Sequence, residues 1–324
     1  MPTDNRMPAS PAVPQCNSQM PLLLLLSVGA FLAVSVLLSK VAFGLNMPML
    51  TYLAFAMVGS GTILLFVLRR SDQGAALRGK VWIYSAIAGG LMALGSAAGY
   101  LTIHVVGAAY ISLAIAFPPM ITWGLSLMLR LERYDLLRGL GLLFALVGGA
   151  ILAFSKGMST PPGMGGHILA ASAIPLILAV GNVFRTRFWP VGVDSRVLAA
   201  LMLISGGGLT LPFAFWIDGP LALLAFTDSG RLAIQLIAVI TFAAQYLLLF
   251  RLQRLAGPVY LSQIGSVAAA FGIPAALLFL GEPLPNNSGI AMVFIILGLF
   301  LFQTRWFSRG RPSAPDRDKQ HVGG

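Results

Sequence analysis

Isolated polar and aromatic side chains inside long apolar stretches are the residues of this chain that could bind a ligand. A polar group that faces lipid loses its hydrogen bonds to water, so such side chains usually face the interior of a helix bundle or a cavity. Their amide, phenol and indole groups form hydrogen bonds without carrying a charge. Hydrogen bonding between helices explains each of them equally well. The candidates for substrate contact are Asn182, Gln245, Tyr246, Tyr260, Gln263, Tyr110, Trp123 and Tyr100.

Four further residues are candidates for gating or for proton coupling, because they lie near the ends of apolar stretches and carry a charge or can gain one. His104 has an imidazole that can take up a proton near neutral pH, although a histidine that faces solvent at an interface is the simpler interpretation. Lys40 ends an apolar stretch and either lines an entrance or extends its ammonium group to the headgroups. Glu132 and Glu282 lie beside basic or turn residues, where each either caps a loop or acts as a gate.

The sequence motifs of common catalytic sites are missing from this chain. It contains no H-E-x-x-H, G-x-S-x-G, P-loop or C-x-x-C pattern, and its three histidines are far apart in the sequence. None of the ten Asp and Glu residues lies in the middle of an apolar stretch. We therefore expect no enzyme, no cofactor and no metal site.

The helices that carry these residues follow from the spacing of the charged residues, since charge is excluded from most membrane spans. Stretches without Asp, Glu, Lys or Arg cover 7–39, 41–68, 81–129, 139–155, 157–184, 197–217, 232–250, 255–281 and 283–304. About 20 residues cross a bilayer, so each stretch holds one helix, and 81–129 holds two that separate near 104–107. The chain is 57% hydrophobic and 10% charged, with a mean hydropathy of +0.86. We predict an all-α integral membrane protein with ten transmembrane helices, at about 22–39, 49–68, 82–103, 108–129, 138–155, 167–185, 197–216, 232–250, 258–280 and 288–306.

An internal repeat relates the two parts of the chain. Identical residues recur at an offset of 150: Gly107/Gly257, Tyr110/Tyr260, Ser112/Ser262, Leu127/Leu277, Glu132/Glu282, Gly139/Gly289, Phe144/Phe294 and Gly148/Gly298. Five predicted helices separate one copy from the next, and an odd number of spans turns the second copy upside down in the bilayer. Inverted repeats of this kind are typical of transporters, whose substrate site lies between the halves near the middle of the membrane.

The repeat and the composition divide the chain into five parts. Residues 1–20 are rich in Pro, Ser and Asn and 308–324 are polar, so both ends are expected to be disordered tails. The first five-helix repeat is expected over 21–156, a linker over 157–166 and the second five-helix repeat over 167–307.

Small residues and prolines indicate where these helices pack closely or bend. Small residues at i, i+4 spacing let two helix backbones approach each other, and a proline inside a helix removes a hydrogen bond and bends it. The small-residue row in the third helix is Ser85, Gly89, Ala93 and Ala97. Pro118, Pro119 and Pro274 lie within the fourth helix of each copy, where they either shape a central cavity or make a purely structural kink.

The net charge of +11 is explained by membrane topology. With the N-terminus inside, all of the 21 Lys and Arg residues except Lys40, Lys156 and Arg231 fall on the cytoplasmic side. This positive-inside bias predicts an inner (plasma) membrane protein with both termini in the cytoplasm, and it accounts for the charge without nucleic-acid binding, so no nucleic-acid partner is expected. It also assigns Arg185 to the cytoplasmic side. The alternative that residues 22–38 are a cleaved signal peptide lacks an A-x-A cleavage site.

Several motifs resemble those of a known transporter family. The first copy contains A-A-Y-I-S-L-A-I-A-F-P-P and L-R-L-E-R, and the second contains G-P-V-Y-L-S-Q and P-A-A-L-L-F-L-G-E-P-L. Over about 22–307 the chain is similar to the EamA-type branch of the drug/metabolite transporter superfamily. The resemblance implies ten helices in two inverted five-helix halves around a central cavity, and export of amino acids, other metabolites or drugs. The first copy departs from the family pattern at Arg130-Leu131-Glu132, where Leu-Gly-Glu is usual, and at Pro118-Pro119, where one proline is usual.

We therefore predict a transporter of small organic metabolites that works as an exporter by alternating access, in the lipid bilayer, as a monomer or homo-oligomer. Without a mid-membrane carboxylate, facilitated diffusion or exchange is expected rather than coupling through a buried acid. Without a charged group deep in the cavity, a neutral or zwitterionic solute is expected. The alternative is a lipid-active membrane enzyme or a flippase-like protein, which would need a reactive polar cluster at one interface.

Overall fold

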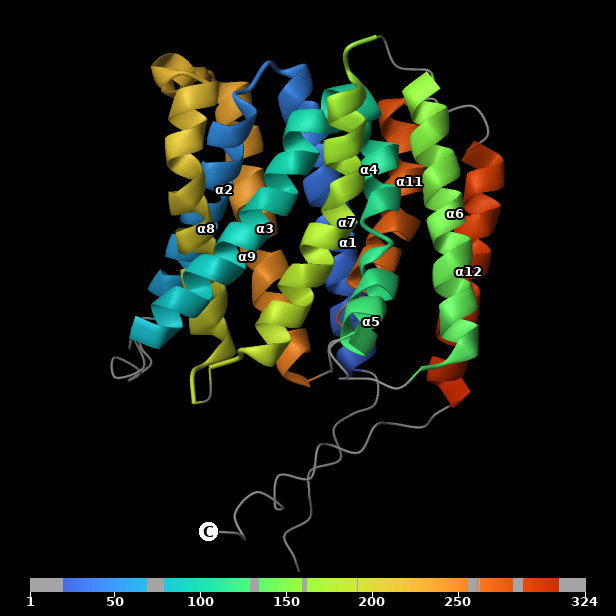
Figure 1. The fold of residues 1–324 in the computed structure, drawn as a ribbon. Coiled ribbons are helices and arrows are strands. Elements are labelled where there is room, and N and C mark those ends of the chain that lie inside the picture. Colours follow the sequence, from blue (N-terminus) through green and yellow to red (C-terminus); the bar gives the residue numbers. More distant parts are fainter. Residues whose placement is uncertain are drawn as a thin grey trace, which may run out of the picture.

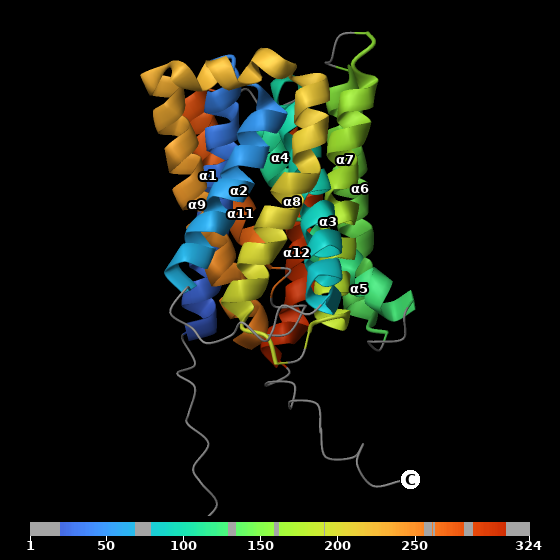
Figure 2. The same ribbon diagram turned by 90° about the vertical axis from the view of Figure 1, so that its left-hand side faces the viewer.

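Every element that the structure describes is a helix. The computed structural model describes residues 20–68, 79–128, 134–158, 162–190, 192–255, 261, 263–281 and 288–308. The elements are α1 (Met20–Gly44), α2 (Met49–Leu68), α3 (Gly79–Val106), α4 (Ala108–Ala114), α5 (Pro118–Met128), α6 (Leu136–Met158), α7 (Gly165–Arg187), α8 (Ser195–Ile217), η2 (Pro220–Thr227), α9 (Ser229–Leu255), α11 (Ile264–Leu280) and α12 (Ser288–Ser308). They run along a common axis, except η2, which lies across one end of the bundle (Figures 1 and 2).

Length and composition confirm an all-α membrane protein. Among the described residues, seven helical segments are long and apolar enough to cross a membrane, one of them being Ala108–Leu125, which joins α4 to most of α5. Three shorter apolar segments accompany them, at Leu136–Ile151, Ile264–Leu280 and Gly289–Gly298. The count of ten spanning helices and the inversion of the second repeat stay predictions.

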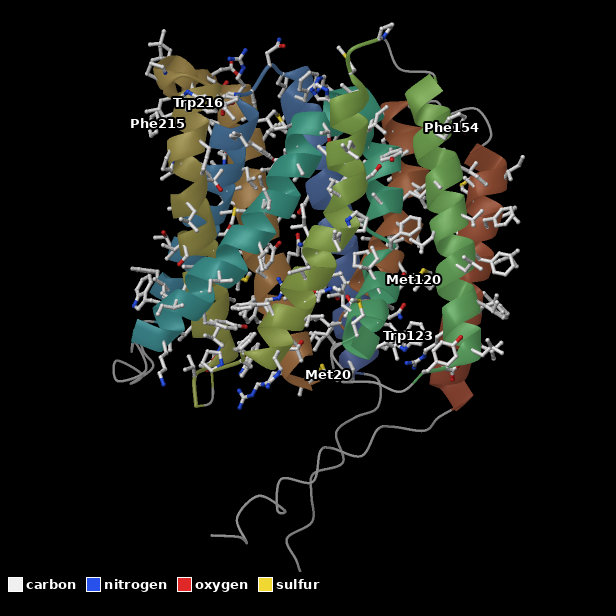
Figure 3. All side chains as sticks on the ribbon, viewed as in Figure 1. Met20, Met120, Trp123, Phe154, Phe215 and Trp216 are labelled. Carbon is white, nitrogen blue, oxygen red and sulfur yellow. The ribbon has the colours of Figure 1, made fainter. Side chains whose placement is uncertain are left out.

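The surface of the bundle is apolar where a soluble protein would be polar. Trp216 is 82% exposed and Phe154 72%, and both point away from the bundle in Figure 3. Trp123 and Met120 are each 1% exposed and lie inside. Large contiguous apolar surfaces are rare on soluble monomers, so this outer surface is suited to lipid.

The long uncharged stretch 81–129 contains two helical segments, as predicted, and the second of them is broken. Gly107 separates α3 from α4 and has a φ of 84°, a conformation that glycine adopts without strain. A single helix with a bend was predicted over 108–129, but α4 ends at Ala114 and α5 begins at Pro118. A proline lacks the N–H that continues a helix and fits its first turn, so Pro118 starts a new helix instead of bending one.

The helices pack in pairs that join the early and late parts of the chain. Helix α2 packs on α8, and α6 packs on α12 at the edge of the bundle (Figure 1). Helix α3 crosses α7 and α8, while α1 lies against α9 and α11. The cavity described below lies in the centre of the bundle and takes wall residues from α1, α3, α4, α7, α9 and α11.

Asp194 caps the N-terminus of α8. Its Oδ1 accepts a hydrogen bond from the backbone N–H of Arg196 at 2.7 Å, and the Arg196 side chain donates to both of its carboxylate oxygens. Burial alone would raise the pKa of this carboxyl, but the hydrogen bonds from Arg196 outweigh it and hold the pKa below its ordinary value. A depressed pKa means that the stabilisation is fully present above the ordinary Asp pKa and is lost as the pH falls from there through the lowered pKa of the folded protein.

Replacing Asp194 by alanine is therefore expected to lower the free energy of unfolding by about 1 kcal/mol at neutral pH. Asparagine at this position keeps a side-chain oxygen for the cap, so Asp194→Asn should lower the free energy of unfolding by less than Asp194→Ala does. Thermal unfolding of the purified variants in detergent measures both. Equal melting temperatures for the wild type and Asp194→Ala would contradict a stabilising cap.

Candidate functional site

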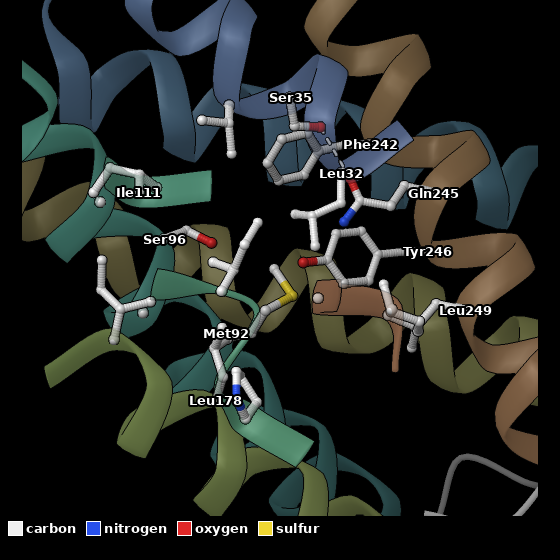
Figure 4. Close-up of a pocket in the computed structure, with 18 of the residues that line it drawn as sticks. Leu32, Ser35, Met92, Ser96, Ile111, Leu178, Phe242, Gln245, Tyr246 and Leu249 are labelled. Atoms are coloured by element: carbon white, nitrogen blue, oxygen red, sulfur yellow. Dashed lines mark hydrogen bonds between the residues drawn. The ribbon is translucent and has the colours of Figure 1, made fainter. Parts of the chain in front are cut away.

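A cavity lies in the centre of the bundle between α1, α3, α4, α7, α9 and α11 (Figure 4). Its volume is about 120 Å³, roughly ten times the ~10–15 Å³ that one water molecule needs. Most of its wall is apolar and comes from residues such as Met92, Leu178, Phe242 and Leu249. The cavity is thus large enough for a small organic molecule and mostly suited to apolar groups.

Four of the eight predicted contact residues line this cavity. They come from three helices: Tyr100 from α3, Asn182 from α7, and Gln245 and Tyr246 from α9. All four are buried, with exposed fractions between 2% and 8%. Three helices that are distant in sequence thus bring neutral hydrogen-bonding groups together at one cavity.

The other predicted contact residues lie elsewhere. The Tyr110 hydroxyl is 2.9 Å from the Ser172 hydroxyl, and the Trp123 ring lies 6.4 Å from that of Tyr134. Gln263 precedes the first turn of α11 and is not among the residues that line the cavity. The described part of the chain does not include Tyr260, nor the two gate candidates Glu132 and Glu282.

Gln245 is held at the cavity by a contact between α1 and α9. Ser35 Oγ lies 2.9 Å from Gln245 Oε1 and donates to it, as the dashed line in Figure 4 marks. The same hydroxyl lies 3.0 Å from the carbonyl oxygen of Phe31. A serine hydroxyl has one hydrogen, so it donates to one of these acceptors at a time. Ser35 therefore keeps a hydrogen-bond partner within α1 even when Gln245 turns toward a ligand.

Tyr100 separates the central cavity from a second hollow. That hollow is also lined by Asn46, His104 and Asp218, and Tyr100 is the residue that both share among those described. The Tyr100 ring lies 5.7 Å from the ring of Tyr52, and its hydroxyl forms no hydrogen bond within the described residues. No hydrogen bond to the described residues therefore fixes the Tyr100 hydroxyl between the cavity and the hollow.

The second hollow is lined by two titratable groups that are distant in the sequence, His104 and Asp218, and His104 has further neighbours outside its wall. The His104 ring stacks on Phe43 at 5.1 Å and meets the ring of His167 edge-on at 5.2 Å. Lys40 Nζ donates to the carbonyl oxygen of Ile103 at 3.4 Å. Lys40 was predicted to end its helix, but α1 continues to Gly44, so the lysine packs against α3 rather than reaching from a helix end.

Arg185 is the functional candidate that sequence reasoning missed. The charge bias assigned it to the cytoplasmic side, and the cavity was expected to lack a deep charge. The structure instead buries Arg185 to 5% exposure in α7, where it lines the central cavity. Its Nη2 donates to Asn182 Oδ1 at 2.5 Å, and the Tyr84 hydroxyl donates to its backbone oxygen at 3.3 Å. The signal that could have found it is its position three residues after Asn182, on the same helix face.

Metal binding has no support in the described part of the chain. No group of three or more His, Cys, Asp and Glu side chains there is arranged to hold an ion. The polar atoms of the cavity wall are those of amides, hydroxyls and one guanidinium, which suit an organic ligand.

Comparisons with known proteins identify the second half of the chain. Residues 165–304 match the EamA-like transporter family, which confirms the predicted resemblance for this part. No curated protein sequence matches the chain. Among the solved structures, 17 chains match. One crystal structure has a TM-score of 0.63 at 19% identity and covers 90% of this chain and 99% of its own. At that identity the similarity shows a shared fold and nothing further.

Proposed function

Residues 165–304 form a domain of the EamA-like transporter family, and from this premise we propose that the chain moves a small organic solute across a membrane. The observation that carries the proposal is the central cavity, whose wall takes residues from helices both before and after residue 165. A site built from both parts of the chain opens and closes when the parts move relative to each other.

The packing of the helices supports two inverted five-helix repeats, at about 21–156 and 167–307, and ten membrane crossings. If α1, α2, α3, α4 with α5, and α6 correspond to α7, α8, α9, α11 and α12, the observed contacts map onto one another. The pair α3 and α7 corresponds to α9 and α1, and the pair α3 and α8 to α9 and α2. The pairs α2 with α8 and α6 with α12 correspond to themselves. In Figure 1, α1 and α7 run in opposite directions, as inverted repeats require.

The cytoplasm is proposed to face the end of the bundle where α1 begins and α12 ends (Figure 1). Lys80 and Arg196 lie in the first turns of α3 and α8 at this end, and Arg254 in the last turn of α9. Arg231 lies in the first turn of α9 at the other end. The excess of basic residues supports an inner-membrane protein with cytoplasmic termini. The resemblance to the EamA-type branch supports export.

Uptake and counterflow in proteoliposomes test the proposal. The purified chain is reconstituted and offered a panel of amino acids, organic acids, nucleosides and cationic dyes, with and without an imposed pH gradient. We expect saturable counterflow of one chemical class without an effect of the gradient, because the cavity wall contains no carboxylate among its described residues. A strong dependence on the gradient would contradict facilitated diffusion or exchange and would make His104 the first residue to replace. An absence of counterflow across the panel would argue against transport.

Alternating access predicts that a cysteine in the cavity reacts from one side of the membrane at a time. Cys16 is the single cysteine of the chain, so Cys16→Ser supplies a background for Ser96→Cys, which lies in the cavity wall on α3 (Figure 4). When a transported solute is added, the introduced cysteine should react faster with an impermeant thiol reagent supplied on one side of the membrane and more slowly with reagent supplied on the other. Leu94→Cys is the control, because Leu94 lies on the same helix, is 56% exposed toward lipid and should stay unreactive. Equal reaction from both sides at once would indicate an open pore.

A further inference from the structure

We infer that Arg185 binds the carboxylate of an amphipathic organic monoanion carried in the central cavity. The inference rests on the proposed transport function and names the substrate class of the same site. It starts from a cation that is buried inside a membrane protein and has no acidic partner within the described residues.

The environment of Arg185 leaves its charge uncompensated. The side chain is 5% exposed, and no ion pair involving it exists within the described part of the chain. One guanidinium nitrogen, Nη2, is bound by the neutral oxygen of Asn182, while the buried Nε has no hydrogen-bond partner among the described residues. Arginine keeps its proton in proteins, so it cannot become neutral as a buried lysine would. A buried cation without a counter-ion is costly, and such residues in membrane proteins face cavities where they meet an ion or substrate.

The chemistry of the guanidinium indicates a planar anion of single charge. Its N–H groups form a rigid fork that matches the two oxygens of a carboxylate. Asn182 lies beside it with an amide that also forms hydrogen bonds. Arg185 is the only charged side chain among the described residues that line the cavity. A dianionic phosphate ester would therefore leave one negative charge unmatched.

The remainder of the wall determines what the carboxylate is attached to. Ile174, Leu178, Met92 and Phe242 present apolar surface to the cavity, which suits an aliphatic or aromatic body. A primary ammonium group would find hydroxyl and amide oxygens but no carboxylate among the described lining residues. These features favour a monocarboxylate with an apolar body over the neutral or zwitterionic solute that the sequence predicted.

A matched pair of probes tests the inference in the full-length chain. 3-Phenylpropionate and 3-phenylpropan-1-ol share the same apolar body and differ in charge. The dissociation constant of each is measured from the saturable rise in melting temperature of the purified protein in detergent. We expect the carboxylate to bind roughly tenfold to a hundredfold more tightly than the alcohol, because a hydrogen bond to a charged group is stronger than one between neutral groups. Equal affinity of the two probes, or no stabilisation by the carboxylate, would overturn the inference.

Substitutions then assign the effect to Arg185. Arg185→Gln should remove the preference for the carboxylate, and Arg185→Lys should keep part of it, since lysine retains the charge but lacks the fork. Arg187→Gln is the matched control, because Arg187 is two residues away on α7 and exposed. An unchanged preference in Arg185→Gln would overturn the assignment. If Arg185→Gln does not fold, the affinities of the two probes are compared between the wild type and Arg185→Lys. An equal preference for the carboxylate in these two proteins would then overturn the assignment to Arg185.

The binding measurement tests the substrate class and the transport measurement tests the proposed function, so a negative result in one can be told apart from a negative result in the other. Selective binding of the carboxylate at Arg185 without counterflow would support the site and contradict the transport function. Counterflow of neutral or cationic solutes without selective binding of the carboxylate would support transport and overturn this inference.

Discussion

Replacing Gly206 by alanine should destabilise the protein by about 1–3 kcal/mol or more, as expected for an overpacked helix contact. A Cβ at this position in α8 would lie 2.6 Å from the backbone oxygen of Gly89 in α3. From the other side, a Cβ on Gly89 would lie 2.3 Å from the backbone oxygen of Met202. Backbone atoms cannot move aside as a side chain does, so the two helices would have to separate. Because α3 also lines the cavity, the separation would disturb the site as well.

The control for this prediction is Gly208→Ala in the same helix. Nothing lies within 4 Å of a Cβ at Gly208, which is exposed. Alanine favours a helix over glycine by about 0.8–1.0 kcal/mol, so this variant should be as stable as the wild type or more stable. Thermal unfolding of both variants in the same detergent measures the difference. A Gly206→Ala protein that melts at or above the temperature of Gly208→Ala would show that α3 and α8 are not in close contact.

Replacing Gln245 by leucine should reduce transport by roughly tenfold while leaving the fold intact. The amide is 2% exposed and lines the cavity, and a substrate group left unpaired in such a site costs about 1–3 kcal/mol. The fold should survive because Ser35 keeps the carbonyl oxygen of Phe31 as an acceptor. Initial rates of counterflow, normalised to the amount of reconstituted protein, measure the loss.

Gln235→Leu separates a role in transport from a role in folding. Gln235 lies on the same helix as Gln245, is 5% exposed and donates to the backbone oxygen of Tyr52 at 3.3 Å, away from the cavity wall. Its replacement should lower the melting temperature and leave the rate per folded molecule close to that of the wild type. If Gln245→Leu transports as fast as Gln235→Leu, Gln245 does not contact the substrate. Gln263, which also matched the sequence criterion, lies outside the cavity wall and is not used in this test.

Sequence spacing predicted the helices well because each helix is set by local chemistry. Each charge-free stretch holds most of a described helix, although several helices extend past the end of their stretch to include a charged residue, as α1 does at Lys40. The separation expected near 104–107 is the helix boundary at Gly107. The break before Pro118 was expected as a bend, since the sequence indicates that a proline interrupts a helix but not how far the chain departs from it. The residues carrying polar groups were also recognisable, because an amide or phenol in an apolar stretch stands out.

The sequence could not tell which polar residues meet. Asn182, Gln245, Tyr246 and Tyr100 were chosen by the same criterion as Tyr110 and Trp123, yet the packing of α3, α7 and α9 places only the first four at the cavity. In the sequence, the four residues at the cavity cannot be distinguished from Tyr110 and Trp123. The difference comes from the direction in which each helix face points, which depends on helix crossings set by contacts between distant segments.

By itself, the sequence determined a helical membrane protein with an internal repeat, because hydrocarbon excludes charge and requires each segment to satisfy its own backbone hydrogen bonds. Only the tertiary structure decided where charge sits. Arg185 counts as a cytoplasmic residue when positions are read along the chain, but the crossing of α7 with α3 buries it beside Asn182 in the cavity wall. His104 has no titratable neighbour in sequence, but folding brings His167 to its ring. Helix packing decides which groups surround a charged side chain, because those groups come from segments that are distant in the sequence.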